Sequence, residues 1–251
     1  MIQLAPIESI KDRNIANIFN LSNSADLGTV FCDFDGPIVD VSERYYQTYK
    51  LCLNQFKSLD LNSKKLSKKQ FWQMKQNRIS DIKIAKRSGL RSEQIDRFLA
   101  EVRSIVNHPT LLEADRIQPG VTWALLKLRS QGRKIVLVTL RCQSQVREIL
   151  KKAGLEHLIG DVYGRKDKHS AYQNNAELKT ELLQEAIAAH GHKSSNCQIG
   201  DTEADIIAAK QVGIKSIALT CGIRSSSYLS KYQPDYLCQD LPAATNHLVA
   251  F

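Results

Sequence analysis

The sequence predicts an α/β protein with a doubly wound, Rossmann-like parallel sheet and an inserted α-helical domain. From Pro119 onward, apolar strand-like runs alternate with amphipathic helical segments. The strand-like runs are almost continuously apolar, which is typical of parallel strands buried on both faces. Residues 42–115 differ, because apolar residues recur there at helical spacing and β-branched runs are few. Alternating strands and helices favour a parallel sheet covered by helices on both faces.

The first strand is expected early in the chain. The run Thr29–Cys32 is short, apolar and β-prone, and it stops at Asp33. This pattern predicts a buried strand that carries acids at its carboxyl end. Before it, the segment IANIFNL at residues 15–21 predicts an amphipathic helix.

The helical stretch predicts three to five helices, with loops near Asp60–Ser63 and Ser88–Gly89. We therefore expect a helical domain at residues 42–116, inserted into a core made of residues 1–41 and 117–251. A chain of 251 residues is long enough for one large domain with a modest insert.

The second half predicts a regular series of elements. Its first helix has Pro119 at its start and Gly132 just past its end. After it we expect strands in KIVLVTL (134–140), LIGDVYG (158–164), NCQIGD (196–201), SIALTCG (216–222) and DYLCQD (235–240), and helices in SQVREILKKAGL (144–155), LKTELLQEAIAAHG (178–191) and ADIIAAKQVGI (204–214).

Composition narrows the class of protein. The net charge of +9 favours anionic partners, either nucleic acid or a phosphorylated small molecule. No zinc-finger spacing or RNA-binding aromatic pattern is present, so we expect no nucleic-acid partner. No apolar run approaches the ~20 residues of a membrane helix, and no secretory signal is recognised. The six cysteines form no C-x-x-C pair, which favours reduced thiols in a cytoplasmic protein.

Acidic and phosphate-binding side chains lie at the ends of the predicted strands and at the start of one predicted helix. In open parallel sheets, ligands bind outside the carboxyl ends of the strands. Two acids at a buried strand end are costly unless a cation neutralises them. Mg²⁺ suits a site made of a few carboxylates, waters and a substrate phosphate. The residues in question are Asp33, Asp35, Thr139, Lys179, Asp201 and Asp205.

This chemistry favours phosphoryl transfer. A carboxylate attacks phosphorus to form an aspartyl-phosphate, and the metal shields the two anions from each other. Thr139 offers a hydroxyl and a backbone N–H to phosphate oxygens, and Lys179 offsets negative charge. Asp35 is placed to protonate the leaving oxygen and then to activate water. Each residue alone has a commoner structural explanation, as a turn, a cap or a solvated side chain, so the prediction depends on their combination and order.

The motifs resemble those of the haloacid dehalogenase superfamily of phosphatases, from about Thr29 to Asp240. The first motif is DFDGPIVD at 33–40, and the second is VTLR with Thr139. The third is Lys179 in LKTELLQEAI, and the fourth is GDTEADIIAAKQVG, from Gly200. The tail IALTCGIRSSSYLSKYQPDYLCQDL is similar to phosphoglycolate phosphatase-like members, and the insert resembles their α-helical cap.

The resemblance implies a role for each matching residue. Asp33 would be the nucleophile and Asp35 the general acid/base. Mg²⁺ would be held by Asp33, the main-chain carbonyl of Asp35, and Asp201, with Asp205 supporting the metal shell. The substrate would be bound by Thr139, Leu140, Arg141, Lys179 and Arg44. The implied activity is Mg²⁺-dependent hydrolysis of a small phosphorylated metabolite; a phosphomutase, or a catalytically silent binding or regulatory protein, is the alternative.

Two residues depart from the family pattern. Pro37 stands where most members have threonine, and it removes an N–H and a hydroxyl from the linker. Arg141 stands where asparagine or a small residue is usual, either as an extra phosphate ligand or pointing outward.

Two further alternatives stay open. Lys166 and Lys168 compete with Lys179 for the third motif, which we assign to Lys179 from its distance to Asp201. The insert also carries basic residues that either recognise a second anionic group or form a solvated face, with Arg44 and Tyr45 better placed near the first motif. These basic residues are Lys64, Lys65, Lys68, Lys69, Lys83, Lys86 and Arg87.

Overall fold

The computed structural model describes residues 27–57, 64–166 and 174–249. The helix expected at 15–21, the loop expected near Asp60–Ser63, and Lys168 lie outside the described residues. In the part of the chain that is described, no helix is both long and apolar enough to cross a bilayer.

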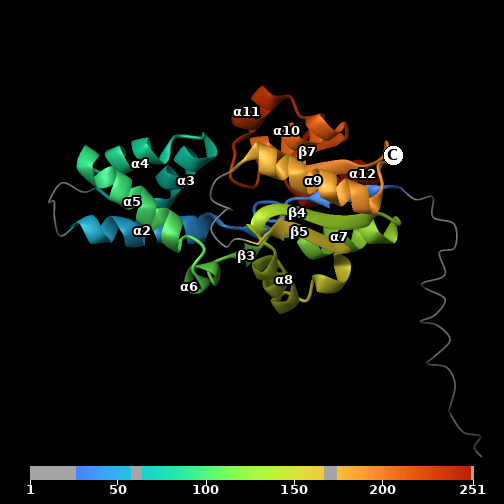
Figure 1. Ribbon diagram of the computed structural model, residues 1–251, viewed down its shortest axis with the longest axis horizontal. Helices are drawn as coiled ribbons and strands as arrows, with labels where there is room; N and C mark the ends of the chain where they lie inside the picture. The colour runs from blue at the N-terminus through green and yellow to red at the C-terminus, as the bar shows by residue number, and fades with distance from the viewer. Residues whose placement is uncertain (1–26, 58–63, 167–173, 250–251) are drawn as a thin grey trace, which may run out of the picture.

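A parallel sheet forms the centre of the larger lobe (Figure 1). Its strand order is β5-β4-β1-β6-β7-β8, and all neighbouring strands run parallel. The strands are β1 (Thr29–Cys32), β4 (Lys134–Cys142), β5 (Asp161–Arg165), β6 (Cys197–Gly200), β7 (Lys215–Leu219) and β8 (Tyr236–Cys238). From β1 the sheet grows through β4 on one side and through β6 on the other, so the doubly wound parallel fold is confirmed. This reversal places the end of β1 where ligands of such sheets bind.

Helices cover both faces of the sheet because its strands are apolar on both faces. One face packs against α7 (Val121–Ser130), α8 (Gln143–Lys152) and α12 (Leu241–Val249). The other face packs against α9 (Ala176–His190) and α10 (Glu203–Val212). Side chains alternate along β1, so Val30 belongs to the first core and Phe31 to the second.

The helical insert forms a second lobe beside the carboxyl ends of the strands (Figure 1). It comprises α2 (Ser42–Lys57), α3 (Lys68–Gln76), α4 (Asp81–Arg87), α5 (Ser92–Ile105) and α6 (Pro109–Leu112). The interior of the insert is rich in aromatic side chains and is continuous with the core on one face of the sheet. Within it, the Tyr49 and Phe71 rings stack with centroids 4.8 Å apart. Its entry and exit are joined by β2 (Val39–Asp40) and β3 (Arg116–Ile117), which pair antiparallel.

Several short elements were not predicted. They are β2, β3, the 3₁₀ turns Glu156–Leu158 and Ser230–Tyr232, α11 (Ser226–Leu229) and the longer α12. For α12 a signal existed, because Asp240 caps the helix by accepting a hydrogen bond from the N–H of Ala243 at 2.9 Å. The strand predicted at 134–140 continues to Cys142, so Arg141 lies within β4 rather than after it.

Candidate active site

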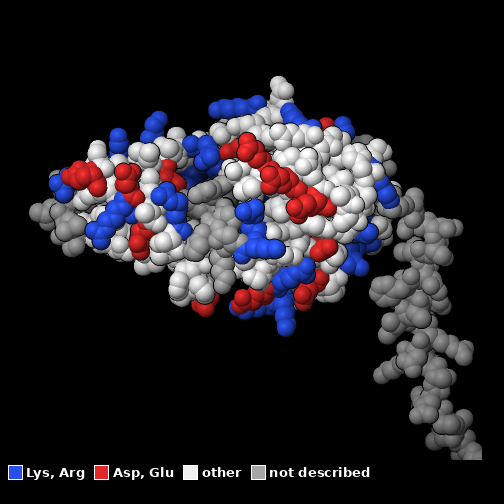
Figure 2. Space-filling view, in the orientation of Figure 1, with Lys and Arg blue, Asp and Glu red and all other residues white. Residues whose placement is uncertain are grey.

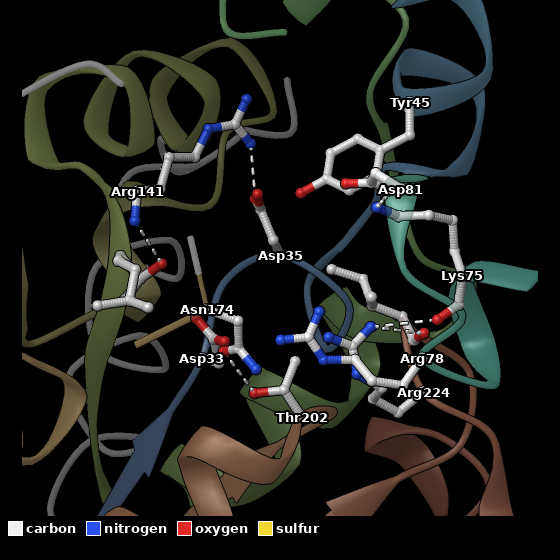
Figure 3. A pocket seen from close by; sticks show the side chains of 13 residues that line it. Asp33, Asp35, Tyr45, Lys75, Arg78, Asp81, Arg141, Asn174, Thr202 and Arg224 are labelled. Atoms are coloured by element: carbon white, nitrogen blue, oxygen red, sulfur yellow. Dashed lines mark hydrogen bonds and ion pairs between the residues drawn. The ribbon is translucent and has the colours of Figure 1, made fainter. Parts of the chain in front are cut away.

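A polar cavity of about 70 Å³ lies between the carboxyl ends of the strands and the helical insert (Figure 3). Asp33 and Asp35 enter it from the segment after β1, and Thr139 from β4. From the insert come Tyr45, Lys75, Arg78 and Asp81, and from the remaining core come Leu140, Arg141, Asn174, Thr202, Ile223 and Arg224. Both lobes therefore build its wall.

The Asp33 carboxylate is held by a lysine and by the backbone N–H of the next residue. Its Oδ2 lies 2.9 Å from Nζ of Lys179, and its Oδ1 accepts a hydrogen bond from the N–H of Phe34 at 2.6 Å. Burial raises the pKa of Asp33 to about 7, although Lys179 opposes the shift. Burial alone would disfavour the charged lysine, but Asp205 and Asp33 raise the Lys179 pKa, so the ammonium stays charged.

Asp33, Asp201 and Asp205 form a carboxylate cluster suited to a hard cation. One oxygen from each lies within 4.8 Å of the others. Asp201 is fully buried, and its Oδ2 accepts a hydrogen bond from the N–H of Ile223 at 2.5 Å. Its Oδ1 has no hydrogen-bond partner among the described residues. A buried carboxylate oxygen left unpaired is costly, and a divalent cation would satisfy it. The residues present therefore fit a Mg²⁺ ion.

Asp205 lies in the same cluster but is already engaged. Its Oδ2 accepts from the hydroxyl of Thr202 at 2.8 Å and from the Thr202 N–H at 3.2 Å, which caps α10. Its Oδ1 lies 2.8 Å from Nζ of Lys179 and accepts from Gln198 at 3.2 Å. Asp205 thus orients Lys179 and the start of α10, which fits a supporting role beside a metal.

Asp35 points away from this cluster, toward two arginines. Its Oδ1 lies 2.7 Å from Arg141 and its Oδ2 lies 2.9 Å from Arg44. Burial would raise the Asp35 pKa, but Arg141 and Arg44 outweigh it and hold the pKa below its ordinary value. Both arginines also contact Asp115, a residue that the sequence did not single out.

The residues predicted to bind substrate divide into two groups. Thr139, Leu140 and Arg141 line the cavity, whereas Arg44 and Lys179 are buried and do not. Arg141 does not point outward; its guanidinium faces the two carboxylates, and its backbone N–H donates to Oγ1 of Thr139 at 3.2 Å. Both terminal nitrogens of Arg141 are engaged by carboxylates, so its role as a phosphate ligand stays a prediction.

Lysine placement distinguishes the candidates for the third motif. Lys179 is buried at the site, whereas Lys166 is exposed to solvent. The basic residues singled out on the insert are exposed, or half-buried in the case of Lys68, and none lines the cavity. On the face shown in Figure 2, basic and acidic side chains are intermixed over the insert.

Pro37 is compatible with the turn in which it lies. The N–H groups of Ile38 and Val39 donate to the carbonyl of Phe34, and Gly36 donates to the carbonyl of Val39. These bonds close the turn without a donor from residue 37. A proline at this position therefore stiffens the link between Asp35 and β2 without breaking it.

Sequence reasoning missed the cations that face the cavity from the insert and from the loop after β7. Glu203, in the fourth motif, joins two of them: its Oε1 lies 3.0 Å from Nε of Arg78, and its Oε2 lies 2.8 Å from Nε of Arg224. We call these three residues the Glu203 bridge. It ties the insert to the core, and no local pattern signals it because Arg78 and Glu203 are 125 positions apart.

The family profile of the haloacid dehalogenase-like hydrolases matches residues 30–219. The chain belongs to this family. The predictions of its family and of a hydrolase are thus confirmed, and Asp33, Thr139 and Asp201 all lie within the matched region.

Named relatives of this hydrolase are distant. Pyrophosphatase PpaX of Halalkalibacterium halodurans is 26% identical over 61% of this chain and 69% of the relative. A phosphoglycolate phosphatase of Synechococcus elongatus is 25% identical over 88% of this chain and 98% of the relative. With a phosphoglycolate phosphatase of Vibrio cholerae, the match spans only 54% of that protein.

The solved structures support the fold. A haloacid dehalogenase-like family hydrolase from Streptococcus pneumoniae superposes with a TM-score of 0.65 at 21% identity. The superposition covers 87% of this chain and 97% of the other. At this identity the likeness concerns architecture, and the chemistry has to be argued from the site.

Proposed function

We propose that this hydrolase is a Mg²⁺-dependent phosphatase that cleaves a small, polar phosphorylated metabolite through an aspartyl-phosphate on Asp33. The proposal rests on the surroundings of Asp33. Its carboxylate faces the cavity, contacts Lys179, and lies beside the unsatisfied oxygen of Asp201. Relatives named phosphoglycolate phosphatase and pyrophosphatase PpaX support the same reaction class.

The proposed reaction has two halves. The Asp33 carboxylate attacks phosphorus, the bond from phosphorus to the leaving oxygen breaks, and Asp35 gives that oxygen a proton. Water then attacks the phosphorus of the aspartyl-phosphate and passes a proton to Asp35. The bond between phosphorus and the Asp33 oxygen breaks, so phosphate is released and the Asp33 carboxylate is regenerated. Lys179 balances charge, and Thr139 holds a phosphoryl oxygen.

Mg²⁺ would be held by Asp33 and Asp201, with the main-chain carbonyl of Asp35 completing the protein ligands. When bound, it supplies positive charge that lowers the repulsion between nucleophile and phosphate. Asp205 acts through Lys179 and the start of α10. The small charged cavity favours a compact polar leaving group over a nucleoside or an apolar chain, because its lining offers few apolar surfaces.

The proposal is tested by Asp33→Asn, which keeps the shape of the side chain and removes its nucleophilic carboxylate. We expect Mg²⁺-dependent release of phosphate from p-nitrophenyl phosphate or acetyl phosphate to fall at least about a thousandfold. A screen of phosphorylated metabolites, with phosphoglycolate and pyrophosphate included, identifies the preferred substrate. Turnover that is unchanged in Asp33→Asn contradicts the proposal.

The other two functions give different results in the same assays. A phosphomutase accumulates phosphoenzyme with a sugar phosphate and releases little free phosphate. A silent binding protein shows no activity across the panel and no heat of Mg²⁺ binding in calorimetry. Neither outcome is compatible with Asp33-dependent hydrolysis.

A further inference from the structure

Four buried charged side chains form a closed ring beside the cavity. Asp35 contacts Arg44 and Arg141 at 2.9 and 2.7 Å, and Asp115 contacts the same two arginines at 2.9 and 2.6 Å. We call these residues the charge ring. Opposite charges alternate around it and its formal charge is zero. The two arginine side chains are completely buried and that of Asp115 is 2% exposed, so water contributes little to their solvation.

The charge ring joins both connections between the lobes. Arg44 lies in the first turn of α2, where the chain enters the insert, and Asp115 lies just before β3, where it leaves. Asp35 and Arg141 belong to the core. Asn107, which precedes α6, accepts a hydrogen bond from Nη1 of Arg44 at 2.6 Å and so extends the ring into the insert.

Asp115 does not line the cavity, but it determines where the two guanidinium groups point. Each arginine gives one nitrogen to Asp115 and another to Asp35. If Asp115 lost its charge, Arg141 would be free to turn fully onto Asp35 or toward a phosphate. Arg44 would keep its hydrogen bond to Asn107 and lose its second carboxylate. The direction of the Asp35 carboxylate would then change, because both of its oxygens are held by these groups.

We propose that Asp115 is a positioning residue for the reaction, acting through Arg44 and Arg141 to aim Asp35 at the leaving oxygen. The inference rests on the proposed phosphatase function and assigns Arg44 and Arg141 to orienting Asp35 rather than to binding phosphate. Because Asp115 and Arg44 sit at the two ends of the insert, the aim of Asp35 also depends on how the insert packs against the core.

The test is Asp115→Asn, with kcat/KM measured for p-nitrophenyl phosphate and for phenyl phosphate. These substrates are similar in size, but phenol is a much poorer leaving group than nitrophenol. Its departure therefore depends more strongly on a proton from Asp35. The value of kcat/KM reports on the steps up to phosphoryl transfer to Asp33. We expect kcat/KM for p-nitrophenyl phosphate divided by kcat/KM for phenyl phosphate to rise by about tenfold or more. A change of this size lies within the rate enhancement that a general acid usually contributes.

The matched control is Glu113→Gln, which removes one negative charge from an exposed side chain two positions away. It should leave the ratio unchanged, and Asp115→Glu should restore part of the loss. If Asp115→Asn does not fold, Arg44→Gln/Asp115→Asn keeps the ring neutral and should show the same rise. A ratio equal to that of the wild type, with a change only in melting temperature, overturns the inference. Activity that survives Asp33→Asn instead overturns the phosphatase proposal.

Discussion

Asp33 and Asp35 are two positions apart, yet their surroundings shift their pKa values in opposite directions. Burial raises the pKa of Asp33 to about 7, while Arg141 and Arg44 overcome burial and lower that of Asp35. Asp35 therefore rests as a carboxylate, the form that takes a proton from water. In the proposed reaction, a bound phosphoryl group would bring negative charge beside Asp35 and raise its pKa, which favours the protonated form that the leaving oxygen needs.

The raised pKa of Asp33 predicts a pH dependence of metal binding. Mg²⁺ requires the ionised carboxylate, so its affinity should fall as the pH drops below about 7. Asp201 adds to the effect, because burial and then the charge of Asp33 raise its pKa well above the ordinary value. Calorimetry from about pH 5 to 8, in buffers of different ionisation enthalpy, should show protons released on binding. An affinity independent of pH would falsify this assignment.

The same shift predicts how the metal-free protein responds to pH. The native state keeps the Asp33 proton up to about pH 7, whereas the unfolded chain loses it near 3.8. This contribution to stability is complete below the unfolded pKa and is lost as the pH rises through the native pKa. Urea unfolding with a chelator present should therefore show stability falling across this interval, and Asp33→Asn should flatten the curve.

At the scale of elements, the turn after β1 depends on the glycine that faces Asp201. Gly36 has a φ of +99°, and a Cβ placed on it would overlap the Asp201 carboxylate. The turn that carries the first motif is thus packed directly against the end of β6. Gly154 has a φ of +69°, and a Cβ placed there would meet no described atom within 4 Å, so it offers a control at an unrelated turn.

Gly36→Ala should reduce both stability and metal binding. Gly154→Ala carries only the backbone penalty of a left-handed residue, about 1–2 kcal/mol. Gly36→Ala adds a clash that pushes Asp201 out of place, so we expect a larger loss of stability together with weaker Mg²⁺ binding. Urea unfolding and Mg²⁺ titration of both variants measure the difference. If both variants lose the same stability and Mg²⁺ affinity is unchanged, the close approach of Gly36 to Asp201 does not position the Asp201 carboxylate.

At the scale of the whole molecule, two connections hold the lobes together on opposite sides of the cavity. The charge ring lies at the base of the insert, and the Glu203 bridge joins the turn between α3 and α4 to the core. Backbone contacts reinforce the bridge, since the N–H of Ser225 donates to the carbonyl of Gln76 at 2.9 Å. Arg78 adopts a φ of +58°, a left-handed conformation unusual for arginine, at the turn that reaches Glu203.

Arg78→Gln should weaken closure of the insert more than it weakens folding. The Arg78 side chain is 48% exposed, so the pair with Glu203 contributes less than about 1 kcal/mol to stability. If substrate binds only when the insert is packed against the core as in this structure, disfavouring that arrangement by this amount raises KM by up to about fivefold. Steady-state kinetics and thermal unfolding separate the two effects.

Two further variants distinguish closure from direct contact with substrate. If the bridge acts through closure, Glu203→Gln raises KM as Arg78→Gln does. If Arg78 instead contacts an anionic substrate, Glu203→Gln frees its charge and lowers KM. Lys68→Gln breaks an exposed ion pair with Glu43 inside the insert and should leave KM unchanged.

The part of the site that could be predicted is the part formed by residues next to the strands in the sequence. The acids of the first and fourth motifs lie directly after apolar strands, and parallel strands bring their carboxyl ends to one edge. Asp33, Asp201 and Asp205 therefore come together as expected, with Lys179 between two of them. The short ribbon of β2 and β3 escaped prediction because strands of two residues leave no periodic pattern in the sequence.

The sequence by itself determined the alternation of buried strands and helices, and with it the edge at which Asp33, Asp201 and Asp205 meet. Only the tertiary structure decided what each ionisable group faces. Asp115 became a partner of Arg141, and Glu203 a partner of Arg78, because the insert packs against the carboxyl ends of the strands. Glu203 and Arg224 pair within the core, through the loop after β7. Strand periodicity is a local property that depends only on neighbouring residues in the sequence. Ion pairing between residues far apart depends on burial and on the direction of side chains, which exist only once the lobes have packed.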